Sequence, residues 1–195
     1  WLLRRDPWRI GIIALALPFL GPLLLVRRLR KWPMRFGIWV ATLGRRPEDL
    51  GALAEAHIAS LPHGHASVFL TQAVEQLQSH LAQGHRVVIA TGCLEPLAQA
   101  LLRRAGLGHV PLAASTVRPF IGGLVRDQHC FGANKIPMLT AKGFAPPWAT
   151  AYTDHSADIP VLTLSAERVL VSPKPRCLAL IRQSIAGEAT VVGWR

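Results

Sequence analysis

The alternation of strand and helix patterns after residue 85 constrains the fold of this chain more than any other feature. "HRVVIATG" (85–92) is a short β-branched run that predicts a buried strand, and "EPLAQALLRRAG" (95–106) predicts the helix that follows. Further strands are predicted in 110–127 (two, joined by a Gly122-Gly123 turn), 148–154 and 168–173, and further helices in 132–143, 157–166 and 175–187. Because such alternation is typical of doubly wound parallel sheets, we predict a Rossmann-like α/β fold.

The first 84 residues have a different pattern, which is mostly helical. Residues 32–61 predict two helices, the second beginning at Pro47-Glu48-Asp49, because proline and acids favour a helix start. Residues 66–84 predict an amphipathic helix that ends at Gly84. We therefore predict a helical cap over residues 1–84 and an α/β core over residues 85–195.

An uncharged apolar block, "IGIIALALPFLGPLLLV" (10–26), lies within the predicted cap. As one helix its 17 residues would reach about 25 Å, whereas the hydrocarbon core of a membrane is about 30 Å thick. Pro18 and Gly21-Pro22 interrupt it. Three interpretations remain open: a single short membrane span, a re-entrant or interfacial hairpin with both ends on the cytoplasmic side, and a buried helix of a soluble cap.

The net charge of +11 is concentrated at the N-terminal end. Residues 1–50 hold ten of the 22 Lys and Arg residues and only three acids. Basic residues flank the apolar block without the aromatic interleaving of a nucleic-acid groove, so we expect an anionic lipid surface rather than nucleic acid as partner. The cysteines, Cys93, Cys130 and Cys177, are odd in number and far apart, which disfavours both a zinc site and a disulfide framework and fits a reducing compartment.

Five residues that could take part in catalysis or binding fall at predicted strand ends or helix starts. Thr91-Gly92 could bind phosphate through a hydroxyl and free backbone N–H groups, and Lys135 could add a positive charge. Asp154 is a hard oxygen ligand suited to Mg²⁺, and Asp158 could support it. Each also has an ordinary structural interpretation: a Thr-Gly turn, a solvated helix lysine, and acids that open a helix.

The order of these residues resembles a known family. "VVIATG", then "GANK", then "AYTDHSADIPVL" resemble motifs two, three and four of the haloacid dehalogenase-like hydrolase superfamily, in its phosphoserine-phosphatase-like branch. "WLLRRDPWRI", the apolar block and "KWPMRFGIWVATLG" are similar to the corresponding region of the bacterial phosphatidylglycerophosphatase C family.

This resemblance implies a Mg²⁺-dependent phosphomonoester hydrolase that works through an aspartyl-phosphate intermediate. Thr91 and Gly92 would bind the substrate phosphoryl group, Lys135 would balance its charge, and Asp154, supported by Asp158, would ligate Mg²⁺. The substrate would be the terminal phosphate of phosphatidylglycerophosphate in phosphatidylglycerol biosynthesis. The protein would act at the bacterial inner membrane with its catalytic core on the cytoplasmic side, and no protein partner is implied.

One family motif is absent. The DxDxT motif of the first strand supplies the nucleophile and the general acid/base, and here Asp6 stands alone in "RRDPW" without an apolar strand before it. We expect that motif, and the first strand of the core, to precede residue 1, and we expect the chain as given to be inactive. Two alternatives stay open: a soluble phosphatase of a small phosphorylated metabolite, and a non-catalytic lipid-binding protein with the same scaffold.

Overall fold

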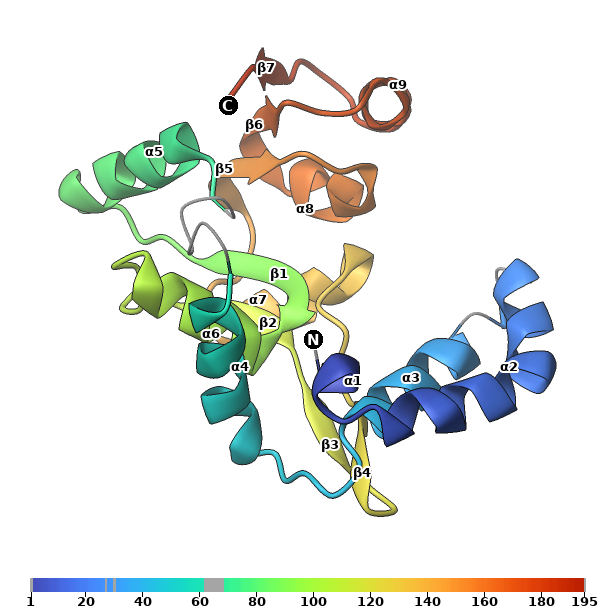
Figure 1. The fold of residues 1–195 in the computed structure, drawn as a ribbon. Coiled ribbons are helices and arrows are strands. Elements are labelled where there is room, and N and C mark those ends of the chain that lie inside the picture. Colours follow the sequence, from blue (N-terminus) through green and yellow to red (C-terminus); the bar gives the residue numbers. More distant parts are fainter. Residues whose placement is uncertain (1, 27, 30, 62–68, 195) are drawn as a thin grey trace.

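The computed structural model describes residues 2–26, 28–29, 31–61 and 69–194 (Figure 1). In this part of the chain five helices precede the first strand. They are α1 (Leu2–Arg5), α2 (Trp8–Leu25), α3 (Lys31–Ala41), α4 (Asp49–Ala59) and α5 (Thr71–Ala82). Helices predicted for this region are confirmed, and α4 begins at Asp49 as expected. Arg27 and Arg30 of the predicted basic flank lie outside the described residues.

From residue 89 strands and helices alternate, as predicted. The elements are β1 (Ile89–Leu94), α6 (Glu95–Arg104), β2 (Leu112–Ser115), β3 (Val117–Phe120), β4 (Gly123–Arg126), α7 (Lys135–Ala141), β5 (Trp148–Thr153), α8 (Ile159–Thr163), β6 (Ser165–Val171), α9 (Pro175–Ser184) and β7 (Thr190–Val192). Two short 3₁₀ helices, η2 (Gly132–Asn134) and η3 (Ser156–Asp158), lead into α7 and α8. The sequence did not predict β7, because three residues are too few to show a strand pattern.

The strands form three separate sheets rather than one. β1 pairs with β2 in parallel, β3 pairs with β4 as an antiparallel hairpin, and β5, β6 and β7 form a parallel sheet in that order. The predicted α/β class with parallel strands is therefore confirmed. The expected continuous sheet is divided between β1 and β5.

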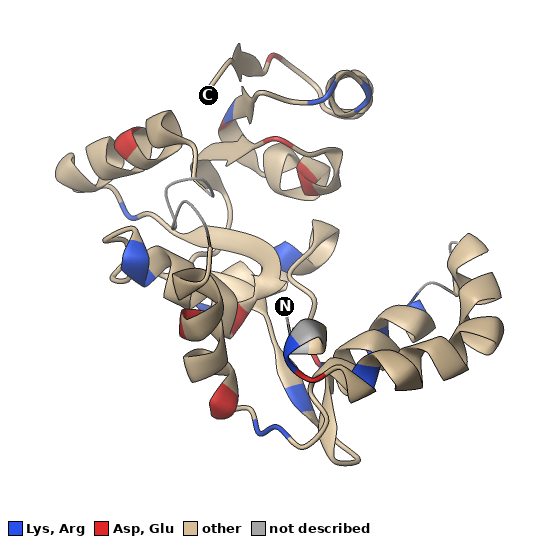
Figure 2. Cartoon of the chain, in the orientation of Figure 1, with Lys and Arg blue, Asp and Glu red and all other residues tan. Residues whose placement is uncertain are grey.

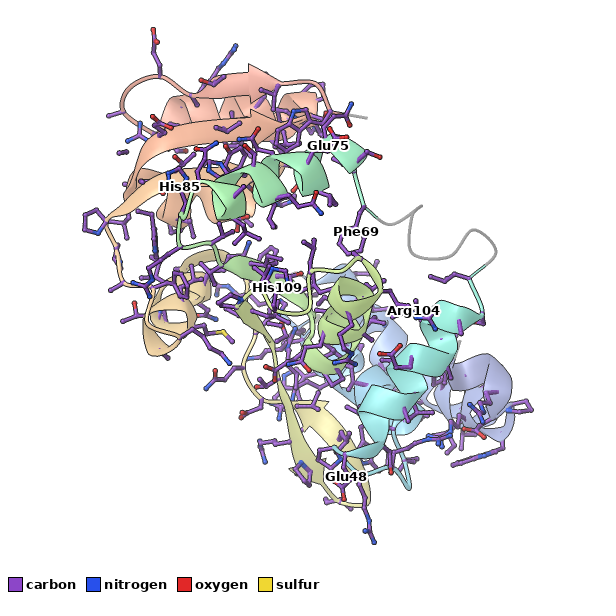
Figure 3. All side chains as sticks on the ribbon, turned by 90° about the vertical axis from the view of Figure 1, so that its left-hand side faces the viewer. Glu48, Phe69, Glu75, His85, Arg104 and His109 are labelled. Carbon is purple, nitrogen blue, oxygen red and sulfur yellow. The ribbon has the colours of Figure 1, made fainter. Side chains whose placement is uncertain are left out.

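α5 and α6 cover the sheet of β1 and β2. The largest apolar cluster includes Leu102 of α6, Leu107 after it and Leu112 of β2, and Leu77 of α5 packs against the same cluster. Phe69, just before α5, points toward α6 (Figure 3). A second cluster joins α8 and α9 to β6, and its buried members are Leu162, Leu170, Ile181 and Ile185.

α2 and α3 stand out from the rest of the molecule, with α2 leading away from it and α3 leading back (Figure 1). Arg9, only 4 % exposed, fixes their base: it donates to the carbonyl oxygens of Val40 (2.8 Å) and Leu43 (2.9 Å) and pairs with Asp6 (3.0 Å). Trp39 of α3 donates from Nε1 to the turn between β3 and β4. The two helices are therefore anchored at their base, while the outer part of α2 has few neighbours.

The outer part of α2 is apolar on all sides and exposed. Leu15, Phe19 and Leu25 are 79–84 % exposed, and only 6 % of the helix is buried. By length and composition α2 could cross a membrane. Of the three interpretations of the apolar block, the buried helix is the one that the described residues do not support, because they leave α2 exposed.

Replacing Gly123 by Ala tests how closely α3 packs against the β3–β4 hairpin, and replacing Gly51 by Ala provides the control. A Cβ at Gly123 would lie 2.9 Å from both the backbone oxygen and the Cδ1 atom of Trp39, so Gly123→Ala should lower the free energy of unfolding by about 1–3 kcal/mol. Gly51→Ala, inside α4 with no atom near the new methyl, should raise it by about 0.5–1 kcal/mol. Urea unfolding measures the free energy of unfolding of both variants. Equal changes in the two variants would contradict the close approach of Gly123 to Trp39.

Candidate active site

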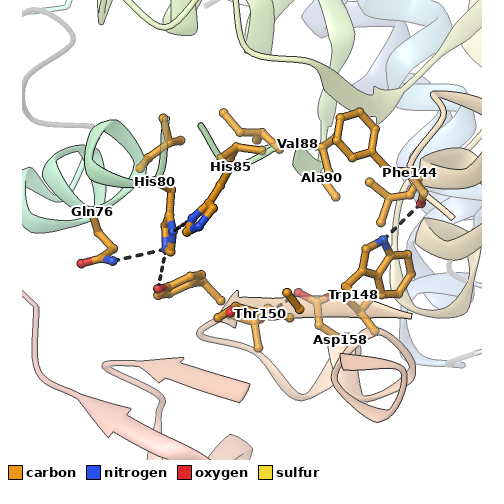
Figure 4. A pocket seen from close by; sticks show the side chains of 18 of the residues that line it. Gln76, His80, His85, Val88, Ala90, Phe144, Trp148, Thr150 and Asp158 are labelled. Atoms are coloured by element: carbon orange, nitrogen blue, oxygen red, sulfur yellow. Dashed lines mark hydrogen bonds between the residues drawn. The ribbon is translucent and has the colours of Figure 1, made fainter. Parts of the chain in front are cut away.

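An open slot of about 630 Å³ separates β1 from β5. In the described part of the chain β1 pairs only with β2 and β5 only with β6, so each strand has one edge without a neighbour. Val88 and Ala90 line one side, and Trp148 and Thr150 line the other (Figure 4). Because an unpaired strand edge offers a row of backbone N–H and C=O groups, a further strand could pair in this slot.

A hydrogen-bonded cluster closes one end of the slot. His80 of α5 contacts Tyr152 of β5 (Nε2 to Oη, 2.8 Å), His85 (Nδ1 to Nδ1, 3.0 Å) and Gln76 (3.2 Å). The Tyr152 ring stacks on Trp194 beyond β7, with ring centroids 5.8 Å apart. Burial raises the pKa of the Tyr152 hydroxyl, so Tyr152 remains protonated and joins α5 to the β5 sheet as a hydrogen-bonding group.

Asp158 lies at the other end of the slot (Figure 4), where it forms an ion pair with Lys135. Lys135 Nζ lies 2.7 Å from Asp158 Oδ1 and 2.8 Å from Oδ2, and the Thr153 hydroxyl donates to Oδ2 at 2.7 Å. Both charged side chains are only 12–13 % exposed. An ammonium has three N–H donors, so Lys135 keeps one for a further anion while Asp158 holds it in place.

Thr91 and Gly92 lie in the last part of β1, where the regular pairing with β2 is interrupted. Thr91 Oγ1 accepts a hydrogen bond from the Cys93 backbone N–H (3.2 Å), which leaves the hydroxyl proton to donate to a ligand. The Gly92 carbonyl accepts from Ser115 (2.9 Å). A Cβ at Gly92 would lie 3.7 Å from the Cys130 carbonyl oxygen, so this turn packs directly on the segment after β4.

That segment, residues 129–132, links the end of β1 to the end of β5. His129 stacks on Phe131 with ring centroids 5.3 Å apart, and Phe131 lies 6.2 Å from the His155 ring. A Cβ at Gly132 would lie 3.5 Å from the Ala157 carbonyl oxygen. The Thr91-Gly92 turn and the segment from His155 to Asp158 therefore contact the same short stretch of chain.

Two groups here, Ser115 at the end of β2 and Cys130 in this segment, resemble nucleophiles. Ser115 lies 3.1 Å from His129, but it is 1 % exposed, donates to the Gly92 carbonyl and accepts from the Cys130 N–H. Burial, with the charge of Arg126, lowers the pKa of His129, and burial raises the pKa of the Cys130 thiol. Ser115 and Cys130 are therefore structural, since a fully bonded hydroxyl and a buried neutral thiol are poor nucleophiles.

Asp154 follows β5 directly, and its exposed carboxylate has no hydrogen bond or ion pair with any described residue. Mg²⁺ commonly takes one or two protein carboxylates and fills its other positions with water and substrate phosphate. Asp154 fits as one such ligand. Both oxygens of Asp158 are engaged by Lys135 and Thr153. Among the described residues, no three His, Cys, Asp or Glu side chains form a cluster that could hold a metal ion.

The sequence model of the haloacid dehalogenase-like hydrolase family matches residues 2–163, most of the chain. The chain belongs to this family. In a haloacid dehalogenase-like hydrolase the edge where Thr91, Lys135 and Asp158 meet is the part expected to carry the chemistry, because ligands of open α/β sheets bind at the carboxyl ends of the strands.

Two curated mycobacterial proteins are similar to part of this chain. A phosphoserine phosphatase of Mycobacterium tuberculosis is 29 % identical over 114 residues, and a putative hydrolase of Mycobacterium leprae is 29 % identical over 111 residues. The matches cover 56 % and 54 % of this chain but only 37 % of either relative, so the chain spans little more than a third of their length.

The fold is also similar to that of two bacterial proteins of known structure. A protein of unknown function from Bordetella pertussis Tohama I has a TM-score of 0.61 at 19 % identity, over 86 % of this chain and 74 % of that one. A probable phosphoserine phosphatase from Vibrio cholerae has a TM-score of 0.55 at 15 % identity, over 96 % and 57 %. At these identities the likeness concerns the fold alone.

The structure thus brings Thr91, Gly92, Lys135 and Asp158 around one edge and places Asp154 beside them. The sequence did not single out Thr153, although its position before Asp154 in "AYTD" was a usable signal for a hydroxyl near both acids. It also did not single out His129 or Phe131. They lie in "DQHCFG" (127–132), which carries no period or motif that would have predicted a role.

Proposed function

We propose that this chain belongs to a Mg²⁺-dependent phosphomonoester hydrolase. The observation that carries the proposal is that Thr91-Gly92, in the last part of β1, and the Lys135–Asp158 pair, at one end of the open slot, both lie against residues 129–132. Family membership and the two phosphoserine phosphatases among the similar proteins support it.

Each side chain has a role that its surroundings support. The Thr91 hydroxyl and the Gly92 backbone N–H donate to phosphoryl oxygens. The free N–H of Lys135 stabilises negative charge on the transferred group, and Asp158 and Thr153 hold the ammonium in position. Asp154 would hold Mg²⁺, which when bound supplies further stabilisation of phosphoryl charge.

The slot supports the expectation that a further strand precedes residue 1. Leu3 of α1 lies with Leu94, Pro96 and Leu97 around a small apolar pocket, so the described N-terminus adjoins the end of β1. A strand that ran through the slot parallel to β1 would end near this point, and its last residues would lie beside Lys135. Such a strand would supply the nucleophilic carboxylate that forms the aspartyl-phosphate.

We further propose that the substrate is a phospholipid phosphomonoester such as phosphatidylglycerophosphate, hydrolysed at the cytoplasmic face of the bacterial inner membrane. The exposed apolar helix α2 and the basic N-terminal region support a membrane surface as partner. The resemblance of the N-terminal region to phosphatidylglycerophosphatase C supports phosphatidylglycerophosphate as the lipid substrate. A small phosphorylated metabolite such as phosphoserine is the second candidate, favoured by the names of the relatives.

The test is phosphate release by a polypeptide that includes the sequence encoded before Trp1, compared with the 195-residue chain. We expect Mg²⁺-dependent release by the longer polypeptide only, faster from phosphatidylglycerophosphate than from phosphoserine, and lost in its Asp154→Asn variant. Faster release of phosphate from phosphoserine would overturn the proposed lipid substrate, but the proposed phosphatase activity would stand. An upstream sequence without an apolar strand ending in DxDxT, together with no release from either compound, would favour a non-catalytic lipid-binding protein.

A further inference from the structure

We infer that α2 and α3 form a wedge that lies in the plane of one membrane leaflet, without crossing the bilayer. This inference rests on the proposed membrane partner and goes further, because it specifies how the chain engages the lipid. The wedge is defined as residues 8–41. At the base of the wedge, Arg9 donates hydrogen bonds to the carbonyl oxygens of Val40 and Leu43, and we call this set of contacts the Arg9 clamp. Because of it, the chain leaves and re-enters the body of the protein at one place.

Helix lengths exclude two crossings of the bilayer. α2 has 18 residues, about 27 Å, and approaches the 30 Å or so of a hydrocarbon core. α3 has 11 residues, about 16 Å, and must bring the chain back to the same base. If α2 crossed the bilayer, α3 could not recross it. Pro18 and Pro22 inside α2 weaken a straight spanning helix further, and Figure 1 shows α2 bending in its outer part.

The distribution of charge excludes insertion tip first. Arg28 and Lys31 lie at the far end of the wedge, where tip-first insertion would place them near the bilayer centre at a cost of about 2.5–3.5 kcal/mol each. Lys31 and Arg35 are one helical turn apart, on the same side of α3, and both approach the Trp32 ring (5.8 and 5.9 Å). This basic and aromatic face is typical of a helix at the headgroup level.

In a wedge that lies in the membrane plane, α2 therefore contacts the acyl chains and α3 contacts the lipid headgroups. Between Arg9 and its end, α2 is uncharged (Figure 2) and its side chains, led by Leu15 and Phe19, can enter the acyl region. α3 lies against it and turns Lys31 and Arg35 toward lipid phosphates. Residues 7–47 contain no acid, so nothing in the wedge repels an anionic surface. An anionic bilayer is thus the partner that fits both its apolar and its charged residues.

Flotation of the 195-residue chain with vesicles tests the lipid contact. We expect binding to vesicles of equal parts phosphatidylglycerol and phosphatidylcholine, and weaker binding to phosphatidylcholine alone. Leu15→Asp with Phe19→Asp should lower the fraction bound more than about tenfold, from the cost of placing a carboxylate among acyl chains. Lys31→Gln with Arg35→Gln should lower binding to the anionic vesicles only. Leu180→Asp, an exposed leucine of α9, is the matched control and should bind like the parent chain.

Thiol labelling of the bound chain tests the topology. Arg28→Cys places a thiol at the far end of the wedge, and the parent chain, whose three cysteines are buried or half-buried, gives the background. A membrane-impermeant maleimide added outside the vesicles should label Cys-substituted chain at once. If the thiol of vesicle-bound chain reacted with the maleimide only after detergent was added, the in-plane wedge would be overturned. The proposed membrane partner would still stand. Absence of binding to either vesicle would overturn both.

Discussion

Replacing Lys135 by Met is expected to lower kcat for phosphate release by about 10²–10³-fold in the polypeptide that includes the expected first strand. Lys135 is a cation at the slot that keeps a free donor, since Asp158 engages the rest of its ammonium. Its loss removes a contact that strengthens as charge develops on the phosphoryl oxygens. Steady-state phosphate release under saturating Mg²⁺ measures the effect.

This substitution also leaves Asp158 as an unpaired, nearly buried carboxylate, which lowers stability. The double variant Lys135→Met with Asp158→Asn removes both charges, so we expect it to recover much of the stability but none of the activity. Lys142→Met is the matched control: it lies just beyond α7, is half exposed, and its nearest acid is 3.9 Å away. Parent-like kcat in the double variant would remove Lys135 from the mechanism.

Local sequence patterns sufficed to predict most elements of this fold, though not β7. The turn at Gly122-Gly123 and the helix start at Asp49 depend on neighbouring residues only, and both appear where expected. The strand predicted over residues 85–92 is present but displaced, because β1 begins at Ile89 and continues through Gly92 to Leu94. Thr91, Lys135 and Asp158 could be singled out for the same reason: strand ends and helix starts of a parallel α/β fold gather at one edge.

Long-range contacts could not be predicted in the same way. Lys135 and Asp158 are 23 residues apart, and their pairing depends on how η2 and η3 meet. The sheet divides between β1 and β5 because no described strand occupies the slot, and no periodicity within either strand reveals that one of its edges is unpaired. Asp6, which as a lone acid in "RRDPW" had no evident role, binds Arg9 and Arg45 from a distant loop.

Replacing Arg9 by Met is expected to lower the free energy of unfolding by about 3–5 kcal/mol. The side chain is 4 % exposed, and its loss leaves the Val40 and Leu43 carbonyls without their donor and Asp6 with one partner fewer. Arg46→Met provides the matched control, because Arg46 is 80 % exposed and lies 3.9 Å from Glu48; it should change stability by less than about 0.5 kcal/mol. Urea unfolding measures both, and similar values for the two variants would contradict the clamp.

The same clamp predicts the sign of one pH effect. Hydrogen bonding from Arg45, with the charges of Arg9 and Arg45, holds the pKa of Asp6 below its usual value despite the opposing effect of burial. A lowered pKa in the folded state means that Asp6 contributes stability above its unfolded pKa and loses it as the pH falls through its folded pKa. Asp6→Asn should therefore be less stable than the parent at neutral pH and should lose less stability on acidification. Parallel acid profiles for the two proteins would show that the ionised Asp6 does not hold the base of the wedge.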